Sequence, residues 1–191
     1  MSTLLVVLAV ILGIALLLVL WLVAVYNRLV ALRQTTGQAW SDVDVQLKQR
    51  HDLVPNLVET VKGYAGHERG TLEAVVQARN AAVSAQGPEA AGAAEGQLGA
   101  ALGRLFALSE AYPDLKANQN FLQLQSELGD IENKIAAARR FFNNAVAEYN
   151  SASQQVPAVF FAGAMGFQPR GFFEVQESER AAIQAAPQVK F

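Results

Sequence analysis

Residues 4–26 read LLVVLAVILGIALLLVLWLVAVY, a run of 23 residues without a charge or a proline. As an α-helix rising about 1.5 Å per residue, this run is roughly 34 Å long, enough to cross a hydrocarbon core of about 30 Å. Trp21 and Tyr26 lie near its C-terminal end, where aromatic side chains favour the headgroup layer. The sequence therefore predicts a membrane anchor over residues 1–26, with the lipid bilayer as its partner through residues 4–26.

A cleaved signal peptide fits this stretch less well than a retained anchor. No Lys or Arg precedes the apolar run, the run is longer than a signal-peptide core of about 7–15 residues, and no Ala-x-Ala pattern follows Trp21. Arg28 and Arg33 lie just beyond its C-terminal end. The positive-inside rule then places the body of the protein in the cytoplasm and the N-terminus outside.

Composition restricts the classes of function. The chain has 15 Lys and Arg residues against 17 Asp and Glu residues, and no cysteine. No basic stripe of the kind that binds a phosphate backbone is present, which excludes nucleic acid as an expected partner. Beyond the anchor, Ala, Leu, Gln and Glu predominate and few segments alternate as strands do. We expect an all-α fold, with an N-terminal transmembrane helix followed by an antiparallel, up-and-down four-helix bundle over residues 27–156.

The course of the chain near Pro55 has two interpretations. Asp52 is a suitable N-cap and Pro55 would then lie in the first turn of a new helix, so that the chain reverses at residues 50–53. Alternatively, Pro55 kinks one continuous helix. We favour the reversal, because a bundle must bury the apolar faces on both sides of this point.

Later helix ends have clearer signals. Gly87-Pro88-Glu89 is typical of a helix start, within an Ala- and Gly-rich stretch over residues 81–101 that we expect to form a hairpin tip. Pro113-Asp114 indicates a turn, and Asn118 a cap for the last long helix. That helix carries apolar residues at heptad a and d positions, a seam that favours packing within the bundle over a homomeric coiled coil. The seam comprises Phe121, Leu124, Leu128, Ile131, Ile135, Ala138, Phe142, Ala145 and Tyr149.

An aromatic tail follows, which we place at residues 157–191. Six large apolar side chains fall within fourteen of its residues, and such patches usually mark an interface. Folding back onto the bundle is the favoured interpretation, and contact with another subunit or with lipid is the alternative. The six are Phe160, Phe161, Met165, Phe167, Phe172 and Phe173.

Chemistry-bearing motifs are scarce. His51 next to Asp52, and His67 next to Glu68, are the histidine–carboxylate neighbours, but adjacent helical residues point about 100° apart. The Glu-x-x-His repeat of di-iron bundles, phosphate-binding glycine loops and a nucleophile elbow are all missing from the sequence. We expect no catalytic residues, no metal and no cofactor, and a cryptic metal-binding bundle enzyme is the least favoured alternative.

Polar residues gather at two of the expected connections. Helix capping explains them most simply, and a surface that docks a protein partner is the functional alternative. They are Asp52, Pro55, Asn56, Glu59, Tyr112, Asp114, Lys116 and Asn118.

Several long strings resemble the bacterial LemA family. They are YNRLVALR (26–33), QAWSDVDVQLKQRHDLVPNLVETVKGYAGHE (38–68), ALSEAYPDLKANQNFLQLQSELGDIENKIAAARRFFNNAVAEYN (107–150), FFAGAMGF (160–167) and FFE (172–174). The resemblance implies one N-terminal membrane helix, a helical bundle and a place in the bacterial cytoplasmic membrane. The family has no agreed biochemical activity and no catalytic residue set, although some relatives are linked to organising bacterial membranes.

We therefore expect a membrane-anchored helical scaffold or adaptor that self-associates as a homo-oligomer and catalyses nothing. The alternative is a regulatory subunit that binds a membrane-protein partner, such as a membrane protease.

Overall fold

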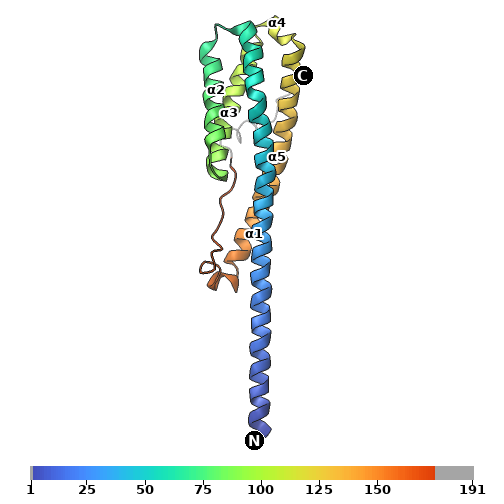
Figure 1. Cartoon of the computed structure of the whole chain (residues 1–191), viewed down its shortest axis with the longest axis vertical. Helices are drawn as coiled ribbons and strands as arrows, with labels where there is room; N and C mark the ends of the chain where they lie inside the picture. The colour runs from blue at the N-terminus through green and yellow to red at the C-terminus, as the bar shows by residue number, and fades with distance from the viewer. Residues whose placement is uncertain (1, 175–191) are drawn as a thin grey trace, which may run out of the picture. The chain divides into compact units, whose positions relative to one another are not determined.

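The computed structural model describes residues 2–174. Within these residues the chain is all-helical and has no strand, as the composition predicts (Figure 1). Most of the chain lies in long α-helices, and one short 3-10 helix follows them. The elements are α1 (Ser2–Ala65), α2 (Arg69–Ser84), α3 (Pro88–Ser109), α4 (Pro113–Lys116), α5 (Gln119–Gln154) and η1 (Ala158–Phe160).

Helix α1 runs for 64 residues, from Ser2 to Ala65. Side chains 2–24 are all exposed, so this apolar stretch is not the core of a soluble body. Among the described residues, α1 is the one helix long and apolar enough to cross a membrane. The predicted N-terminal apolar helix is confirmed.

The predicted chain reversal at residues 50–53 is wrong, because α1 continues through Pro55. Asp52 caps no helix; its carboxylate pairs instead with Lys48, one turn earlier, at 2.6 Å. Residues on both sides of Pro55, among them Val54 and Leu57, are buried on one face of the same helix. The chain reverses only after Ala65, at residues 66–68.

Other helix ends follow their sequence signals. Gly87 has φ +82°, a conformation that glycine adopts readily, and Pro88 begins α3 as expected. The side-chain oxygen of Asn118 accepts the backbone N–H of Phe121 at 3.0 Å, which confirms the predicted cap. The Ala- and Gly-rich stretch forms a tip only at residues 85–87. Its remainder belongs to α2 and α3, which lie side by side (Figure 1).

The described chain forms two compact units. One comprises residues 2–38 and 144–170, and the other residues 39–143 and 171–174. Helices α1 and α5 contribute residues to both. The division at residues 26 and 156 that the sequence suggests stays a prediction.

The larger unit has one continuous core to which α1 to α5 all contribute. Helix α1 supplies Val54, Leu57 and Val61 to this core, while α4, a single turn, buries Leu115 completely. Small residues of α2 and α3 permit close helix approach. The buried members on these two helices are Leu72, Val75, Ala82, Ala94, Leu98, Ala101, Leu102 and Leu105.

The heptad seam of α5 is covered by other parts of the same chain. Seven of its nine residues are buried, and the remaining two, Leu124 and Ala138, are half-buried. This is the outcome expected for packing within the chain. The seam therefore offers no free surface for a homomeric coiled coil.

The smaller unit has its own apolar cluster. Leu29 of α1 and Tyr149 of α5 are buried together with Ala158, Ala162 and Phe167 from the residues that follow α5. The tail thus folds back onto helices of its own chain, as the favoured interpretation expects. Its residues 175–191 lie outside the described part of the chain.

Candidate functional site

An ionic cluster is buried in the core of the larger unit. Arg50 and His51 come from α1 and Glu95 from α3, and these residues are only 4–7% exposed. One carboxylate oxygen of Glu95 accepts a hydrogen bond from Arg50 at 3.0 Å. The other lies 2.5 Å from Nε2 of His51. Both oxygens of a buried carboxylate are thereby satisfied, which a charge in such a place requires.

Two further residues complete the cluster. The guanidinium of Arg50 also approaches the carboxylate of Glu132 on α5 at 3.3 Å, and that carboxylate is 56% exposed. Arg79 on α2 donates from Nε to the backbone carbonyl of His51 at 3.2 Å. Charged groups from α1, α2, α3 and α5 therefore meet at this level of the larger unit.

A pocket of about 280 Å³ adjoins the cluster. His51 and Arg79 line it, together with Lys48, Asp44 and Asp52. The hydrogen bond from Lys48 holds the pKa of Asp52 below its ordinary value. The lining residues include a histidine–carboxylate neighbourhood but no Ser, Thr or Cys that could act as a nucleophile. Among residues 2–174, no group of three His, Asp or Glu side chains could hold a metal ion.

Sequence reasoning missed this cluster. It considered His51 only beside Asp52, whereas the structure pairs His51 with Glu95, 44 residues away. Glu95 lies in the Ala- and Gly-rich stretch, where the sequence pattern is that of an exposed glutamate on a helix surface. A charge buried between helices leaves no local pattern, so no signal in the sequence separates Glu95 from the exposed glutamates.

The second half of the polar residues predicted to dock a partner does gather at one place. These residues are Tyr112, Asp114, Lys116 and Asn118. Tyr112 donates its hydroxyl to the carboxylate of Glu68 at 3.3 Å, and the side-chain amide of Asn118 donates to the hydroxyl of Tyr64 at 2.9 Å. Partial burial raises the pKa of Tyr112, and the charge of Glu68 adds to the shift. Lys116 pairs with Glu110 beside them. These contacts join α4 to the end of α1 and the start of α2.

The first half of that set lies elsewhere. Asp52, Pro55, Asn56 and Glu59 are on the side of α1 rather than at a connection. Glu59 is exposed and pairs with Lys62 at 3.2 Å. The structure does not bring the two halves into contact with one another.

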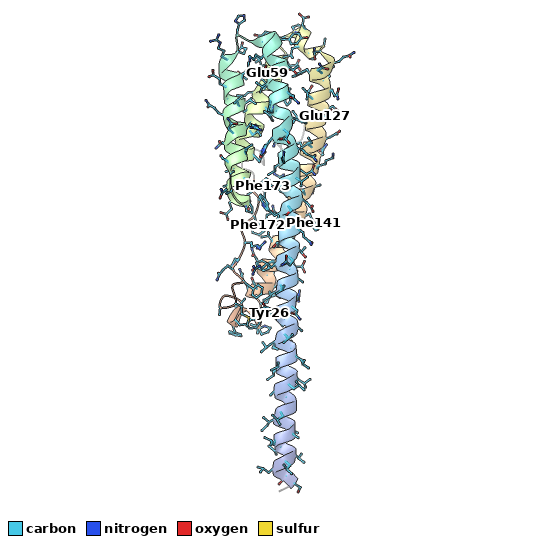
Figure 2. The ribbon with its side chains drawn as sticks, in the orientation of Figure 1. Tyr26, Glu59, Glu127, Phe141, Phe172 and Phe173 are labelled. Carbon is cyan, nitrogen blue, oxygen red and sulfur yellow. The ribbon has the colours of Figure 1, made fainter. Side chains whose placement is uncertain are left out.

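The six aromatic and Met residues of the tail divide evenly. Phe173 (labelled in Figure 2) is fully buried, and its ring lies 5.8 Å from that of Trp40. Phe167 is buried in the smaller unit. Phe161 is half-buried. Phe160, Met165 and Phe172 are exposed, so these three of the six present apolar surface.

Asparagine side chains hold the end of the described tail. In the larger unit, Asn143 accepts the N–H of Phe173 at 2.9 Å and donates to the carbonyl of the same residue at 3.1 Å. In the smaller unit, Asn150 makes the same pair of bonds to Arg170, at 2.8 and 2.9 Å. Each amide thus bonds both the backbone N–H and the backbone carbonyl of one tail residue. The two asparagines are seven residues apart on α5, a spacing that sequence analysis did not single out.

Comparison with known proteins identifies relatives along most of the chain. The model of the LemA family matches residues 39–191. Magnetosome protein MamQ of Magnetospirillum gryphiswaldense is 27% identical over 174 residues, which cover 78% of this chain and 64% of MamQ. Magnetosome protein MamQ 2 of Paramagnetospirillum magneticum is 26% identical, with the same coverage. Protein LemA of Metamycoplasma hominis is 26% identical over 161 residues, which cover 82% of this chain and 72% of that protein. The chain thus spans less than two thirds of the length of the MamQ relatives.

Proposed function

The chain belongs to the LemA family, as its long sequence strings predict, and from this premise we propose that it is a membrane-anchored helical scaffold that self-associates and catalyses no reaction. The body of this scaffold is an antiparallel four-helix bundle, since α1, α2, α3 and α5 all contribute to one core. The bilayer is the bacterial cytoplasmic membrane. Two of the relatives are named as magnetosome proteins, and those names are not carried over to this chain.

One observation carries the proposal. The apolar side chains between Leu4 and Val23 are 42–74% exposed, yet the same uninterrupted helix supplies core residues such as Val61 to the body. Burying a Leu or Val side chain away from water is worth about 1.5–3 kcal/mol. Residues 4–23, most of them large and apolar, are suited to lipid rather than to water, and the helix that continues from them ties the body directly to the bilayer.

The orientation of the proposed scaffold follows from Arg28 and Arg33, which favour a cytoplasmic body. The natural chain has no cysteine, so a single Gln34→Cys substitution supplies a unique reporter on exposed α1. In intact cells, a membrane-impermeant maleimide should leave this cysteine unlabelled until the membrane is opened. Labelling of the cysteine in intact cells would contradict this orientation and place the body outside the cytoplasm.

Exposed apolar side chains of the body support self-association. Phe141 on α5 is 55% exposed, and Phe172 of the tail is also exposed (Figure 2). Large aromatic side chains at the surface are typical of interface anchors. Further exposed apolar residues of the larger unit are Val45, Val76, Val83 and Leu122.

The mass of the full-length protein in nanodiscs tests this proposal. We expect a defined oligomer that the Phe141→Ser and Phe172→Ser variants weaken, while the exposed Gln125→Ser control on the same helix leaves it intact. A protein shortened to begin at Asn27 then reports whether the anchor contributes to assembly. A monomeric full-length protein would contradict self-association and leave an adaptor for some other protein.

A second candidate is a regulatory subunit for a membrane enzyme, such as a protease. The observation in its favour is a groove of about 840 Å³ between α1 and α2, with Val58, Leu72 and Val76 among its lining residues and Lys62 and Arg69 at its polar part. A stoichiometric membrane protein should copurify with the full chain and be lost on Val76→Asp. Loss on Asp114→Ala instead would place the docking surface at α4.

A further inference from the structure

A compact apolar knob, residues 155–167, follows α5 in the smaller unit. It contains the 3-10 helix η1 and several tight turns, closed by backbone hydrogen bonds such as that from Phe167 N–H to the carbonyl of Ala162 at 2.9 Å. Its inner side is fixed, because Ala158, Ala162 and Phe167 are buried against Leu29 of α1. The knob is therefore held firmly on the helix that carries the membrane anchor.

The outer side of the knob is apolar, and within residues 2–174 no contact covers it. Phe160 is 80% exposed, Val156 73%, Met165 53% and Val159 47%. Residues 149–169 include no charged side chain, and the nearest charges along the chain are Glu148 and Arg170. A surface of this composition is costly in water and requires no charge to be desolvated when it enters an apolar phase.

The position of the knob on α1 indicates that the apolar phase it enters is the lipid bilayer. The ring of Phe167 meets that of Tyr26 edge to face, with centroids 5.5 Å apart, and Tyr26 is the last residue of the apolar run. Val25, one residue earlier, packs against the same cluster. The knob thus lies beside the end of the membrane-spanning stretch (Figure 2), at the level where Tyr and Trp side chains meet the headgroups.

We propose that this knob is a second lipid-binding element, in which Phe160, Val156, Val159 and Met165 enter the interfacial layer of the bilayer around Tyr26. The proposal rests on the membrane anchoring of α1 proposed above. A protein partner is disfavoured, because the exposed side chains lie at the depth that headgroups and acyl-chain ends already occupy around the anchor. Apolar side chains in that layer bury against lipid as those of interfacial helices do.

Nitroxide depth measurement on the full-length protein in nanodiscs tests the proposal. Phe160→Cys and Met165→Cys place the label on the knob, while Leu18→Cys in the apolar run and Gln34→Cys on exposed α1 beyond it calibrate lipid and water. All four side chains are exposed, so the substitutions leave the core intact. Collisions with oxygen, which concentrates in lipid, are compared with those of a water-soluble nickel chelate.

We expect the Phe160 and Met165 labels to favour oxygen over the nickel chelate, as the Leu18 label does. Labels that behave like the one at Gln34 would overturn the knob proposal while leaving the anchor in place. Labels shielded from both reagents would also overturn it, in favour of a protein contact. If the Leu18 label itself is reached by the chelate, the anchor fails, and the knob proposal fails with it.

Discussion

Arg79 donates a hydrogen bond to the backbone carbonyl of His51 at 3.2 Å. In an ordinary α-helix this carbonyl accepts the N–H of the residue four positions later, which here is Pro55. Proline has no N–H, so α1 leaves the carbonyl without its helical partner. The side chain from α2 supplies the missing donor, which allows α1 to continue past a residue that usually ends a helix.

This relationship predicts energetic coupling between Pro55 and Arg79. Arg79→Met should lower the free energy of unfolding by about 1.5–3 kcal/mol, because a carbonyl loses a charged donor. In the Pro55→Ala background the cost should be about 1 kcal/mol smaller, because the new backbone N–H at position 55 can satisfy the carbonyl. Urea unfolding of the detergent-solubilised chain, followed by circular dichroism, measures both costs.

Arg104→Met provides the matched control, since Arg104 is exposed on α3. Its cost should be near zero and the same in both backgrounds. Equal costs for Arg79→Met with and without Pro55 would contradict the coupling.

The course of the chain through Pro55 could not be predicted from the sequence. A proline inside a helical pattern indicates a boundary, because the sequence shows the lost donor but not its replacement, Arg79, which lies 28 positions after His51. The heptad seam of α5 was predictable because its period is local. Residues such as Phe121 and Phe142 are buried as that period requires. Features that depend on one residue far away, such as Glu95, were not predictable.

The buried carboxylate of Glu95 should be the most sensitive charge in the larger unit. Glu95→Gln removes the charge that both Arg50 and His51 face, and leaves the guanidinium of Arg50 with only the half-exposed Glu132. Breaking a buried pair in this way typically costs about 3–5 kcal/mol. Glu132→Gln should cost less than about 1 kcal/mol, because that carboxylate remains in contact with solvent. Similar costs for the two variants in urea unfolding would argue against this ranking.

Two glycines of α3 should respond to alanine in opposite directions. A Cβ at Gly92 would collide with the backbone carbonyl of Glu174, whereas one at Gly103 meets no atom within 4 Å. Gly103→Ala should stabilise the protein by about 0.5–1 kcal/mol through helix propensity. Gly92→Ala should destabilise it by about 1–3 kcal/mol, the usual cost of overpacking.

The collision has a spectroscopic readout as well. Displacing Glu174 should disturb Phe173, whose ring lies 5.8 Å from Trp40. In a Trp21→Phe background, the fluorescence of Trp40 should change with Gly92→Ala and not with Gly103→Ala. Unchanged emission in the Gly92 variant would indicate that the tail can shift without disturbing Trp40.

Amide exchange can test the asparagine clamp of the larger unit. The N–H of Phe173 has Asn143 as its acceptor, and the carbonyl of Phe173 has Asn143 as its donor. If each bond contributes about 1 kcal/mol, Asn143→Ala should accelerate exchange at Phe173 about thirtyfold. Asn144→Ala, on the exposed neighbour, should leave the rate unchanged. Equal acceleration by both variants would mean that the clamp contributes nothing specific.

The pair formed by Tyr112 and Glu68 predicts a loss of stability at alkaline pH. Partial burial and then the Glu68 carboxylate raise the pKa of Tyr112 above its ordinary value of 10.0. The folded state therefore favours the neutral phenol, so this contribution is complete below pH 10.0 and is lost as pH rises through the folded-state pKa.

Glu68→Gln should lower the pKa of Tyr112 but leave it above 10.0, since burial, the largest cause, remains. Carbon-13 tyrosine NMR follows the titration, with Tyr112→Phe to assign the signal. Glu110→Gln serves as the control, because Glu110 pairs with Lys116 and does not contribute to the shift at Tyr112. A Tyr112 pKa that responds equally to both glutamine variants would show that general charge, rather than the hydrogen bond at 3.3 Å, sets its value.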